Sequence, residues 1–295
     1  VKLGSWLFLT DQNGISNELL RLMQVAGQDV HVVKTKEAAK AFLKSENAKS
    51  ITGIVHLWAM DSSEEKPNTS LTESLEVVQT HAKAGGTGKH WFVTKGAQSV
   101  NTSDVVLPWQ SQFWGFGRAL QSENPAKFGG CIDLDPNANE TSSIFGRVIN
   151  ELCYSSNDTE IAFRREARHT GYLQKLAPIE GLEPSLKLSP DASYLITGGL
   201  GSLGLEVAQY LAIHGARHLV LTGRSGVSTK SQRNALEAIG DIGTSVEVVT
   251  TDFSNATGGK ELLASLPRLR GIVHAAGVLA DGMLIQQSSE SYEKV

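Results

Sequence analysis

The amino-acid sequence predicts an α/β protein made of two Rossmann-like subdomains, each with a parallel sheet. Short apolar runs rich in strand-forming residues alternate with helical patterns, as they do where crossover helices join parallel strands. A glycine-rich stretch joins an apolar run to a helical pattern at residues 194–211. The length of 295 residues suits two domains of about 150 residues each.

The first half shows this alternation clearly. The expected strands are Ser5–Thr10, Val30–Val33, Ile51–Ala59 and Trp91–Thr94, and the expected helices are Asn17–Ala26 and Ala38–Leu43. The polar segment Asp61–Ser70 has no period, and it is predicted to be a solvated loop. The aromatic residues of Gln110–Leu120 are predicted to lie in the core rather than to stack on a ligand.

Two polar groups of the first half are candidate sites. Asp133 and Asp135 lie at an apolar strand end, where paired carboxylates can do acid–base or metal work. The proline that follows favours capping and turn chemistry instead. Arg164, Arg165 and Arg168 suit an anion site, but a solvated edge strand explains them at least as well.

A segment of low periodicity divides the chain. Gly181–Asp191 holds two prolines and is predicted to be a linker, with the boundary near Ser185. Residues 1–185 are expected to form one subdomain. Residues 186–295, which contain the glycine-rich stretch, are expected to belong to a second.

The glycine-rich stretch carries the functional prediction. A strand over Tyr194–Thr197 leads into four glycines and then a helix that ends at Gly215. Glycines at such a place allow a sharp turn, a close approach of backbone to pyrophosphate and tight packing of helix on strand. The helix N-terminus adds free N–H groups and partial positive charge. An ordinary turn is the alternative to the expected cofactor-binding residues, which are Thr197, Gly198, Gly199, Leu200, Gly201, Ser202, Leu203 and Gly204.

The next expected strand, His218–Thr222, indicates which dinucleotide fits. Arg224 and Ser225 follow it, and no acid stands there. An acid at this place would bind the ribose 2′-hydroxyl of NAD, whereas arginine and a hydroxyl suit the 2′-phosphate of NADP. The sequence therefore favours NADPH, and the missing acid also argues against an S-adenosylmethionine methyltransferase.

Two later strands complete the expected site. Asp252, with Phe253 beside it, follows the strand Ser245–Thr250 and would accept a hydrogen bond from the adenine amino group; a plain strand-end turn is an equal explanation. The strand Gly271–Ala276 contains His274, which we interpret as packed in place rather than catalytic. The backbone is expected to pass close to the nicotinamide ribose at Ala275, Ala276 and Gly277.

The two halves echo each other. Thr10 and Gly14 match Thr197 and Gly201, and Gly53-Ile-Val-His56 recurs as Gly271-Ile-Val-His274. The first copy has Asp11 where the second has a glycine, and an aspartate would repel a phosphate. The first half is thus expected to keep the Rossmann-like shape without the cofactor; chance similarity of short segments is the alternative.

Composition excludes several classes. With 40% apolar and 20% charged residues the chain is ordinary globular protein, and its net charge of −4 argues against a nucleic-acid partner. Cys131 and Cys153 lack metal-ligand spacing, so free thiols in a reducing cytoplasm and no metal site are expected.

No apolar run is long enough for a membrane span, and no signal peptide is seen. Since the chain begins at Val1, we expect it to be a piece of something longer.

Together these motifs resemble the ketoreductase domain of modular polyketide synthases, within the short-chain dehydrogenase/reductase superfamily. In the second half the resemblance rests on three stretches: Thr197-Gly-Gly-Leu-Gly-Ser-Leu-Gly204, Leu221-Thr-Gly-Arg-Ser225 and Val273-His-Ala-Ala-Gly-Val-Leu-Ala-Asp281. The first half resembles that family's non-catalytic structural subdomain in the stretches Trp6–Phe8, Val55–Trp58, Phe92–Ala97, Phe113–Arg118 and Ile132–Pro136.

The resemblance implies a reaction and partners. The reaction would be NADPH-dependent reduction of a β-ketoacyl group to a β-hydroxyacyl group on an acyl carrier protein with a phosphopantetheine arm, beside other synthase domains. Leu279-Ala280-Asp281 resembles a Leu-Asp-Asp signature, in which the last aspartate marks B-type stereochemistry. Asp281 is therefore the expected stereocontrol residue, although Ala280 departs from the signature and a cap on the turn at Gly282 is the alternative.

No catalytic residue is assigned. The superfamily uses a tyrosine acid, a lysine that lowers its pKa and an orienting serine, and this sequence has no Tyr-x-x-x-Lys. Tyr292 lies too soon after Gly277, and Lys294 is expected on the surface. The resemblance implies that the catalytic residues lie beyond Val295, so residues 186–295 would be the N-terminal part of the NADP-binding catalytic subdomain. The chain alone is therefore expected to be inactive. A non-catalytic scaffold or NADP-binding module is the alternative function. A sugar epimerase shares the glycine spacing, but such an enzyme begins with its glycine loop. The long domain ahead of the glycines in this chain therefore argues against that class.

Overall fold

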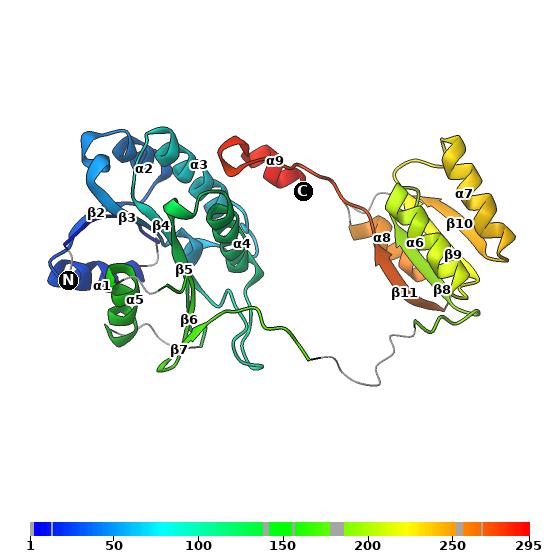
Figure 1. Ribbon diagram of the computed structural model, residues 1–295, viewed down its shortest axis with the longest axis horizontal. Helices are drawn as coiled ribbons and strands as arrows, with labels where there is room; N and C mark the ends of the chain where they lie inside the picture. Colours follow the sequence, from blue (N-terminus) through cyan, green and yellow to red (C-terminus); the bar gives the residue numbers. More distant parts are fainter. Residues whose placement is uncertain are drawn as a thin grey trace. The chain divides into compact units, whose positions relative to one another are not determined.

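The computed structural model describes residues 3–12, 14–137, 142–154, 157–177, 186–251, 256–266 and 268–295 (Figure 1). It separates into two compact units. Unit 1 comprises Val1–Lys175 together with Ala280–Lys294, and unit 2 comprises Leu176–Leu279 with Val295. The expected boundary at Ser185 lies outside the described residues.

Unit 1 is a sheet covered by helices on both faces. Among the described residues seven strands pair in the order β2-β1-β3-β4-β5-β6-β7, all parallel except the last pair. The strands are β1 (Ser5–Leu9), β2 (Asp29–Val33), β3 (Ile51–His56), β4 (Lys89–Lys95), β5 (Phe128–Leu134), β6 (Glu160–Arg164) and β7 (Ala167–Thr170). The predicted α/β class with parallel sheets is confirmed.

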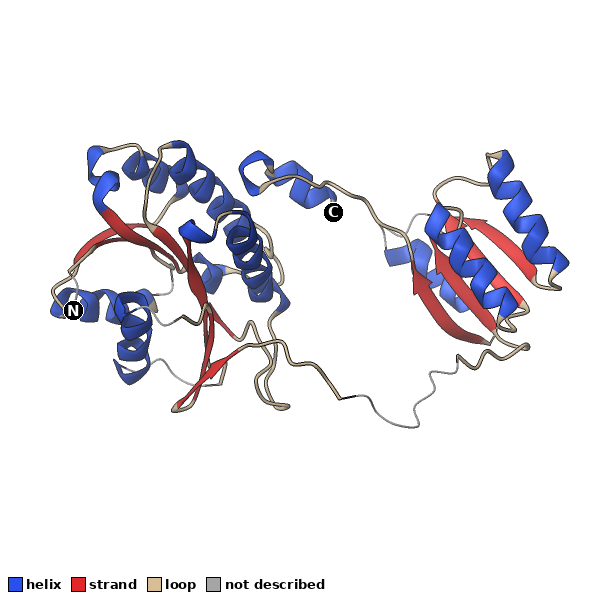
Figure 2. Cartoon of the chain, in the orientation of Figure 1, coloured by secondary structure: helices blue, strands red, loops and turns tan. Residues whose placement is uncertain are grey.

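Two helical layers bury the sheet of unit 1. The helices are α1 (Ser16–Val25), α2 (Lys36–Leu43), α3 (Thr69–Lys83), α4 (Pro108–Glu123) and α5 (Ser142–Tyr154), with short 3₁₀ turns η1 (Glu46–Ser50), η2 (Trp58–Asp61) and η3 (Pro125–Lys127). Helices α1 and α5 cover one face, and α2, α3 and α4 cover the other (Figure 2). The aromatics Phe113, Trp114 and Phe116 of α4 are buried, as predicted.

Two local predictions for unit 1 were wrong, and a third was wrong in part. The strand expected to reach Ala59 ends at His56, because η2 turns the chain at Trp58–Asp61. The segment expected to be loop up to Ser70 gives way to α3 at Thr69. The stretch Glu160–Arg168, interpreted as a solvated edge strand, forms two strands: β7 with the exposed Arg168 is at the sheet edge, but β6 with Arg164 is not.

Unit 2 has the strand order of half a Rossmann fold. Four described strands pair in parallel in the order β10-β9-β8-β11. They are β8 (Ser193–Thr197), β9 (His218–Gly223), β10 (Ser245–Thr250) and β11 (Leu269–His274), and the helices are α6 (Ser202–Ile213), α7 (Lys230–Asp241) and α8 (Ala256–Ser265). The chain changes direction across the sheet between β8 and β11, which is where open α/β sheets bind ligands.

The internal repeat is visible in the register of the strands. Leu9 pairs with His56 in unit 1, and Thr197 pairs with His274 in unit 2. The register therefore matches Thr197 with Leu9, one residue away from the match with Thr10 that the sequence predicted. Each pairing also carries a bulge at its start, between Ser5 and Trp6 in one copy and between Leu269 and Gly271 in the other.

The repeated glycines have one physical cause. A Cβ on Gly53 would stand 2.5 Å from the ring of Trp6, and a Cβ on Gly271 would stand 2.9 Å from the ring of Tyr194. In both copies an aromatic side chain of the neighbouring strand thus lies across the glycine. Only a residue without a side chain fits beneath it.

Candidate cofactor site

The glycine turn of unit 2 is built so tightly that side chains are excluded from three positions. Gly198 has φ +65°, and a Cβ there would stand 2.7 Å from the carbonyl oxygen of Ala275. A Cβ on Gly199 would stand 2.7 Å from Cβ of Leu221, and one on Gly204 would stand 2.4 Å from the Gly198 carbonyl oxygen. The missing side chains thus let the β8–α6 turn pack against β9 at Gly199 and against the end of β11 at Gly198. At Gly204 they let the first turn of α6 pack against the backbone of Gly198 and Gly199.

The turn leaves the start of α6 accessible. Helix α6 begins at Ser202, and Gly201, Ser202 and Leu203 are exposed, while Gly204 is buried. A helix N-terminus carries N–H groups without intrahelical partners and a partial positive charge. The bare backbone and the accessible helix start fit a pyrophosphate, so the residues present suit a dinucleotide.

Hydrogen bonds hold the turn in place. The Gly199 N–H donates to the Thr222 carbonyl at 3.0 Å, and Gln232 Nε2 donates to the Leu200 carbonyl at 3.0 Å. Gln232 also completes a capping box with Thr229 at the start of α7. Sequence reasoning missed Gln232 as a support of the turn, although Thr229-x-x-Gln232 is a recognisable capping pattern.

The end of β9 presents an accessible cation. Arg224 and Ser225 are exposed directly after the strand, and no partner binds the Arg224 guanidinium among the described residues. The hydroxyl of Thr222, two residues earlier, is buried and lacks a hydrogen-bond partner within the same described part of the chain. Guanidinium and hydroxyl groups at this strand end suit a phosphate on the adenosine ribose.

The end of β11 lies beside the glycine turn. The Ala275 N–H donates to the Thr197 carbonyl at 3.0 Å, and a Cβ on Gly198 would also approach Cα of Ala276 within 2.8 Å. His274 was expected to be packed in place, but its side chain is exposed, and its Nδ1 lies 2.6 Å from the Thr197 hydroxyl. The residue is exposed because alternate positions of this edge strand face away from the core.

Not every predicted site residue can be placed with this group. Asp252 and Phe253 lie outside the described residues. Asp281 is exposed and falls in the segment 280–294, which belongs to unit 1, whereas Thr197–Gly204, Arg224 and Ala275–Gly277 belong to unit 2. Lys294 is exposed at the end of α9 (Ser289–Lys294), as expected.

In unit 1 a carboxylate lies at the start of the first helix, α1, which corresponds to α6 of unit 2 in the internal repeat. Asp11 follows β1 and accepts hydrogen bonds from the N–H groups of Ile15, at 2.9 Å, and Ser16, at 2.8 Å. Asp61 accepts the N–H of Gln12 at 3.0 Å. The N-terminus of α1 is therefore capped by the chain's own carboxylate.

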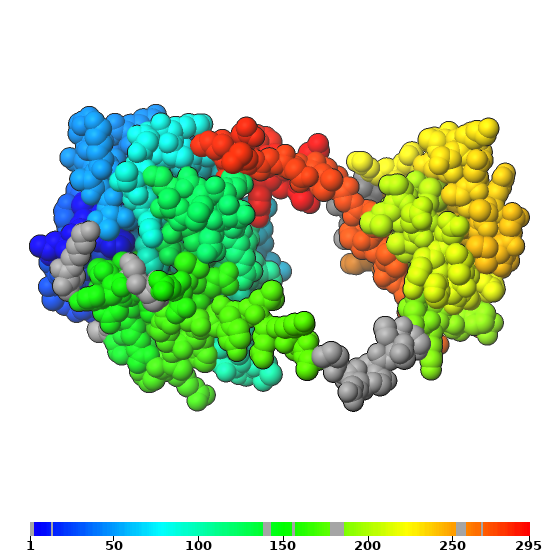
Figure 3. Space-filling view, viewed as in Figure 1, coloured from blue at the N-terminus to red at the C-terminus, as the bar shows by residue number. Residues whose placement is uncertain are grey.

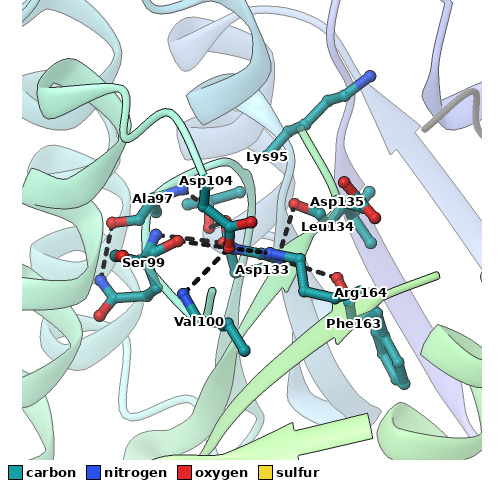
Figure 4. A network of polar contacts seen from close by, with 12 residues as sticks. Lys95, Ala97, Ser99, Val100, Asp104, Asp133, Leu134, Asp135, Phe163 and Arg164 are labelled. Carbon is teal, nitrogen blue, oxygen red and sulfur yellow. Dashed lines mark hydrogen bonds and ion pairs between the residues drawn. The ribbon is translucent and has the colours of Figure 1, made fainter. Parts of the chain in front are cut away.

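Asp133 and Arg164 form a buried structural network with Asp104 (Figure 4), whereas Arg165 and Arg168 are exposed. Asp133 accepts hydrogen bonds from Thr94 Oγ1, the Ala97 N–H and Arg164 Nη2, each at 2.7 Å. Arg164 also donates to Asp104 at 2.7 Å, which lowers the pKa of that carboxyl to about 2. Arg164 is thus neither a solvated edge residue nor part of an open anion site. Only Asp135 shows the expected turn chemistry, because it accepts the N–H of Asn137 at 2.9 Å.

The described residues contain neither a metal-binding cluster nor a membrane-spanning helix. No group of three or more histidine, cysteine, aspartate or glutamate side chains there could hold a metal ion. No helix in the part of the chain that the structure describes is long and apolar enough to cross a membrane. Cys131 and Cys153 are free thiols, and burial raises the pKa of both.

The fold and the turn define a Rossmann-type dinucleotide-binding protein with a duplicated, modified first half. The family described as "KR domain" matches residues 192–295, and the family described as "Polyketide synthase extender module SpnB, Rossmann fold domain" matches residues 13–173. The chain belongs to the ketoreductases of modular polyketide synthases, whose Rossmann domain binds a nicotinamide cofactor.

Relatives of known sequence are much longer than this chain. It is 30% identical over 270 residues to the pikromycin polyketide synthase component PikAIII of Streptomyces venezuelae, covering 88% of this chain and 16% of that protein. It is 31% identical over 256 residues to the polyketide synthase GfsA of Streptomyces halstedii, covering 83% of this chain and 3% of that protein. The chain therefore spans less than a fifth of either relative.

Solved structures share the fold along nearly the whole chain. A C2-type ketoreductase from a modular polyketide synthase superposes with a TM-score of 0.76 at 26% identity, covering 98% of this chain and 65% of that one. A structure of A-type ketoreductases superposes with a TM-score of 0.76 at 25% identity, covering 99% and 64%. These two neighbours are of different types, C2 and A.

Proposed function

We propose that the chain is the cofactor-binding part of an NADPH-dependent β-ketoacyl reductase that works inside a multidomain polyketide synthase. The observation that carries this proposal is the glycine turn, where Gly198, Gly199 and Gly204 exclude side chains beside an accessible helix N-terminus. When bound, NADPH supplies a hydride to the carbonyl carbon of the β-ketoacyl group. Membership of the ketoreductase family supports this reaction.

Preference for NADPH over NADH is supported by the end of β9. The Arg224 guanidinium is exposed there, and no acidic residue lies between Thr222 and Gly226 to bind a free 2′-hydroxyl. Arg224 and Ser225 would hold the 2′-phosphate. Thr197 and the glycine turn to Gly204 would hold the pyrophosphate, and Ala275–Gly277 would border the nicotinamide ribose.

The substrate we propose is a β-ketoacyl chain carried on the phosphopantetheine arm of an acyl carrier protein, with a B-type alcohol as the product. Asp281 is the proposed stereocontrol residue. Neighbouring synthase domains and the carrier protein are the proposed partners, since the relatives of this chain are polyketide synthases. The free thiols Cys131 and Cys153 suit the reducing cytoplasm that we propose as its location.

The reaction can be tested by assaying this ketoreductase within a synthase module on a β-ketoacyl thioester with NADPH. We expect NADPH absorbance to fall and chiral chromatography to resolve one alcohol, of the B type, with Asp281→Ala giving a mixture. An A-type product would contradict the role of Asp281. No consumption of NADPH by a folded module would contradict the reductase and favour a scaffold.

A further inference from the structure

The segment 280–294 is anchored on unit 1 although it follows directly from the loop after β11. Gln79 Nε2, on α3, donates to the carbonyl oxygens of Leu284, at 2.7 Å, and Gln287, at 2.8 Å. The Glu123 carboxylate at the end of α4 accepts the Leu284 N–H at 2.9 Å. Figure 3 shows this segment, in red, lying against unit 1.

Apolar packing and one further hydrogen bond seat the segment between the two helices. Leu284, in the 3₁₀ turn η4 (Leu284–Gln286), packs against the core cluster that contains Phe116. The Tyr292 hydroxyl donates to Gln112 Oε1 of α4 at 2.6 Å. Beneath the segment is an apolar hollow of about 360 Å³, bordered by Leu75 and Phe116.

Gln287 connects this anchor to the turn at Asp281. Its Nε2 donates to the carbonyl oxygens of Ala280, at 2.8 Å, and Gly282, at 3.1 Å, which lie on either side of Asp281. The Ser291 hydroxyl donates to Gln287 Oε1 at 2.8 Å and fixes the amide. Gln79 thus holds the Gln287 backbone, while the Gln287 side chain holds the backbone at Asp281.

The anchored segment begins close to the expected nicotinamide contacts along the chain. Only Val278 and Leu279 separate Gly277 from Ala280, and each residue spans at most about 3.6 Å. Residues 275–283 have no regular secondary structure of their own. Docking therefore attaches the loop at both ends, to β11 and to the segment on unit 1, so the loop has fewer conformations to lose on cofactor binding than a loop attached to β11 alone.

We propose that Gln79 and Gln287 are positioning residues for the loop 275–283: by docking the segment on unit 1, they prepare the nicotinamide side of the site and hold Asp281 in one turn conformation. This inference rests on the proposed function. It requires that docking of the segment and binding of NADPH favour each other, because a coupling free energy between two sites is reciprocal.

The test uses residues 1–295 with Gln79→Glu and Gln287→Glu, which remove the amide donors with little change in size. Gln286→Glu is the matched control, since Gln286 is the exposed neighbour of Gln287 and the change in charge is the same. Affinities are measured for NADPH and for adenosine 2′,5′-bisphosphate, which lacks the nicotinamide half. Hydrogen exchange of the peptide containing Leu284 reports docking.

We expect both variants to raise the Kd for NADPH by about fivefold or more, to leave the Kd for the bisphosphate unchanged and to speed exchange at Leu284. Gln286→Glu should change none of these. An unchanged NADPH affinity, an equal loss for both ligands, or unchanged exchange in the Gln79 variant would overturn the inference. If the unmodified chain binds neither ligand, the proposed function and this inference both fail. If it binds both ligands, the variants test the positioning role alone.

Discussion

At the scale of single residues, the difference between the two copies of the Rossmann-like unit is one of chemistry at the first turn. Asp11 places a carboxylate against the N–H groups of Ile15 and Ser16, whereas glycines leave the start of α6 bare in unit 2. The sequence allowed this contrast to be predicted, because a carboxylate and a phosphate compete for the same N–H groups.

Buried polar networks were the residue-scale features that the sequence did not reveal. Asp133 and Arg164 are separated by about thirty residues, and nothing in either local pattern indicates that they pair. The same holds for three histidines between the sheet and α3. His90 Nδ1 lies 2.9 Å from His56 Nε2, and His90 Nε2 lies 2.9 Å from His81 Nδ1.

These three histidines should make unit 1 sensitive to acid. Burial lowers the pKa of His56 to about 3 and of His81 to about 4, and lowers that of His90 well below its usual value. These imidazoles take up protons below about pH 6.5 in the unfolded chain but not in the folded chain, so their contribution to the free energy of unfolding is fully present above that pH. As the pH falls toward 4, the free energy of unfolding should decrease by about 1.4 kcal/mol per histidine for each pH unit.

Urea unfolding between about pH 7.5 and pH 5 measures this loss. The tested variant is His90→Gln, which removes one of the three groups and should reduce the dependence on pH. NMR of the folded chain should show these three imidazoles, assigned by single His→Gln variants, staying neutral through about pH 6.5. Titration of the three imidazoles near that pH would show that the interior tolerates the charge, contrary to our expectation.

At the scale of elements, two of the failed predictions concern elements whose buried side carries polar residues. Helix α3 was missed because Ser70, Ser74 and His81 stand on its buried side and weaken the apolar period. The strand β6 was placed at an edge because Arg164 and the two arginines after it suggested solvent, but Arg164 is buried by pairing with acids from other elements. Local periodicity cannot report such long-range partners.

Helix α4 offers a matched test of how closely a helix packs on this sheet. A Cβ on Gly117 would stand 2.6 Å from Sγ of Cys131, whereas a Cβ on Gly115 meets nothing within 4 Å. Gly115→Ala should therefore stabilise unit 1 by about 0.5–1 kcal/mol through helix propensity. Gly117→Ala should destabilise it by about 1–3 kcal/mol through overpacking.

Tryptophan fluorescence reports urea unfolding of both variants, since all five tryptophans of the chain belong to unit 1. The two alanine substitutions have the same intrinsic propensity, so any difference between them isolates packing. Equal effects of the same sign would contradict the close contact between α4 and β5.

At the scale of the whole molecule, the chain combines a unit that holds its own first turn closed with a unit whose turn is open to a ligand. The duplication was predictable, because Gly53-Ile-Val-His56 and Gly271-Ile-Val-His274 occupy equivalent places beside β1 and β8. The return of residues 280–294 to unit 1 was not predictable. It depends on Gln79 and Glu123, which have no sequence signature for this role.

The central claim, that unit 2 binds NADPH through the glycine turn and Arg224, is tested most directly by calorimetric titration with NADPH and NADH. Residues 1–295, Arg224→Ala and the control Arg233→Ala, an exposed arginine of α7, should be compared. A charged hydrogen bond to phosphate is worth about 1.5–3 kcal/mol, so Arg224→Ala should weaken NADPH binding by about tenfold or more. Binding of NADH should be weaker in the unmodified chain and the same in all three proteins. Equal affinity for both cofactors, or no effect of Arg224→Ala on NADPH, would contradict the account.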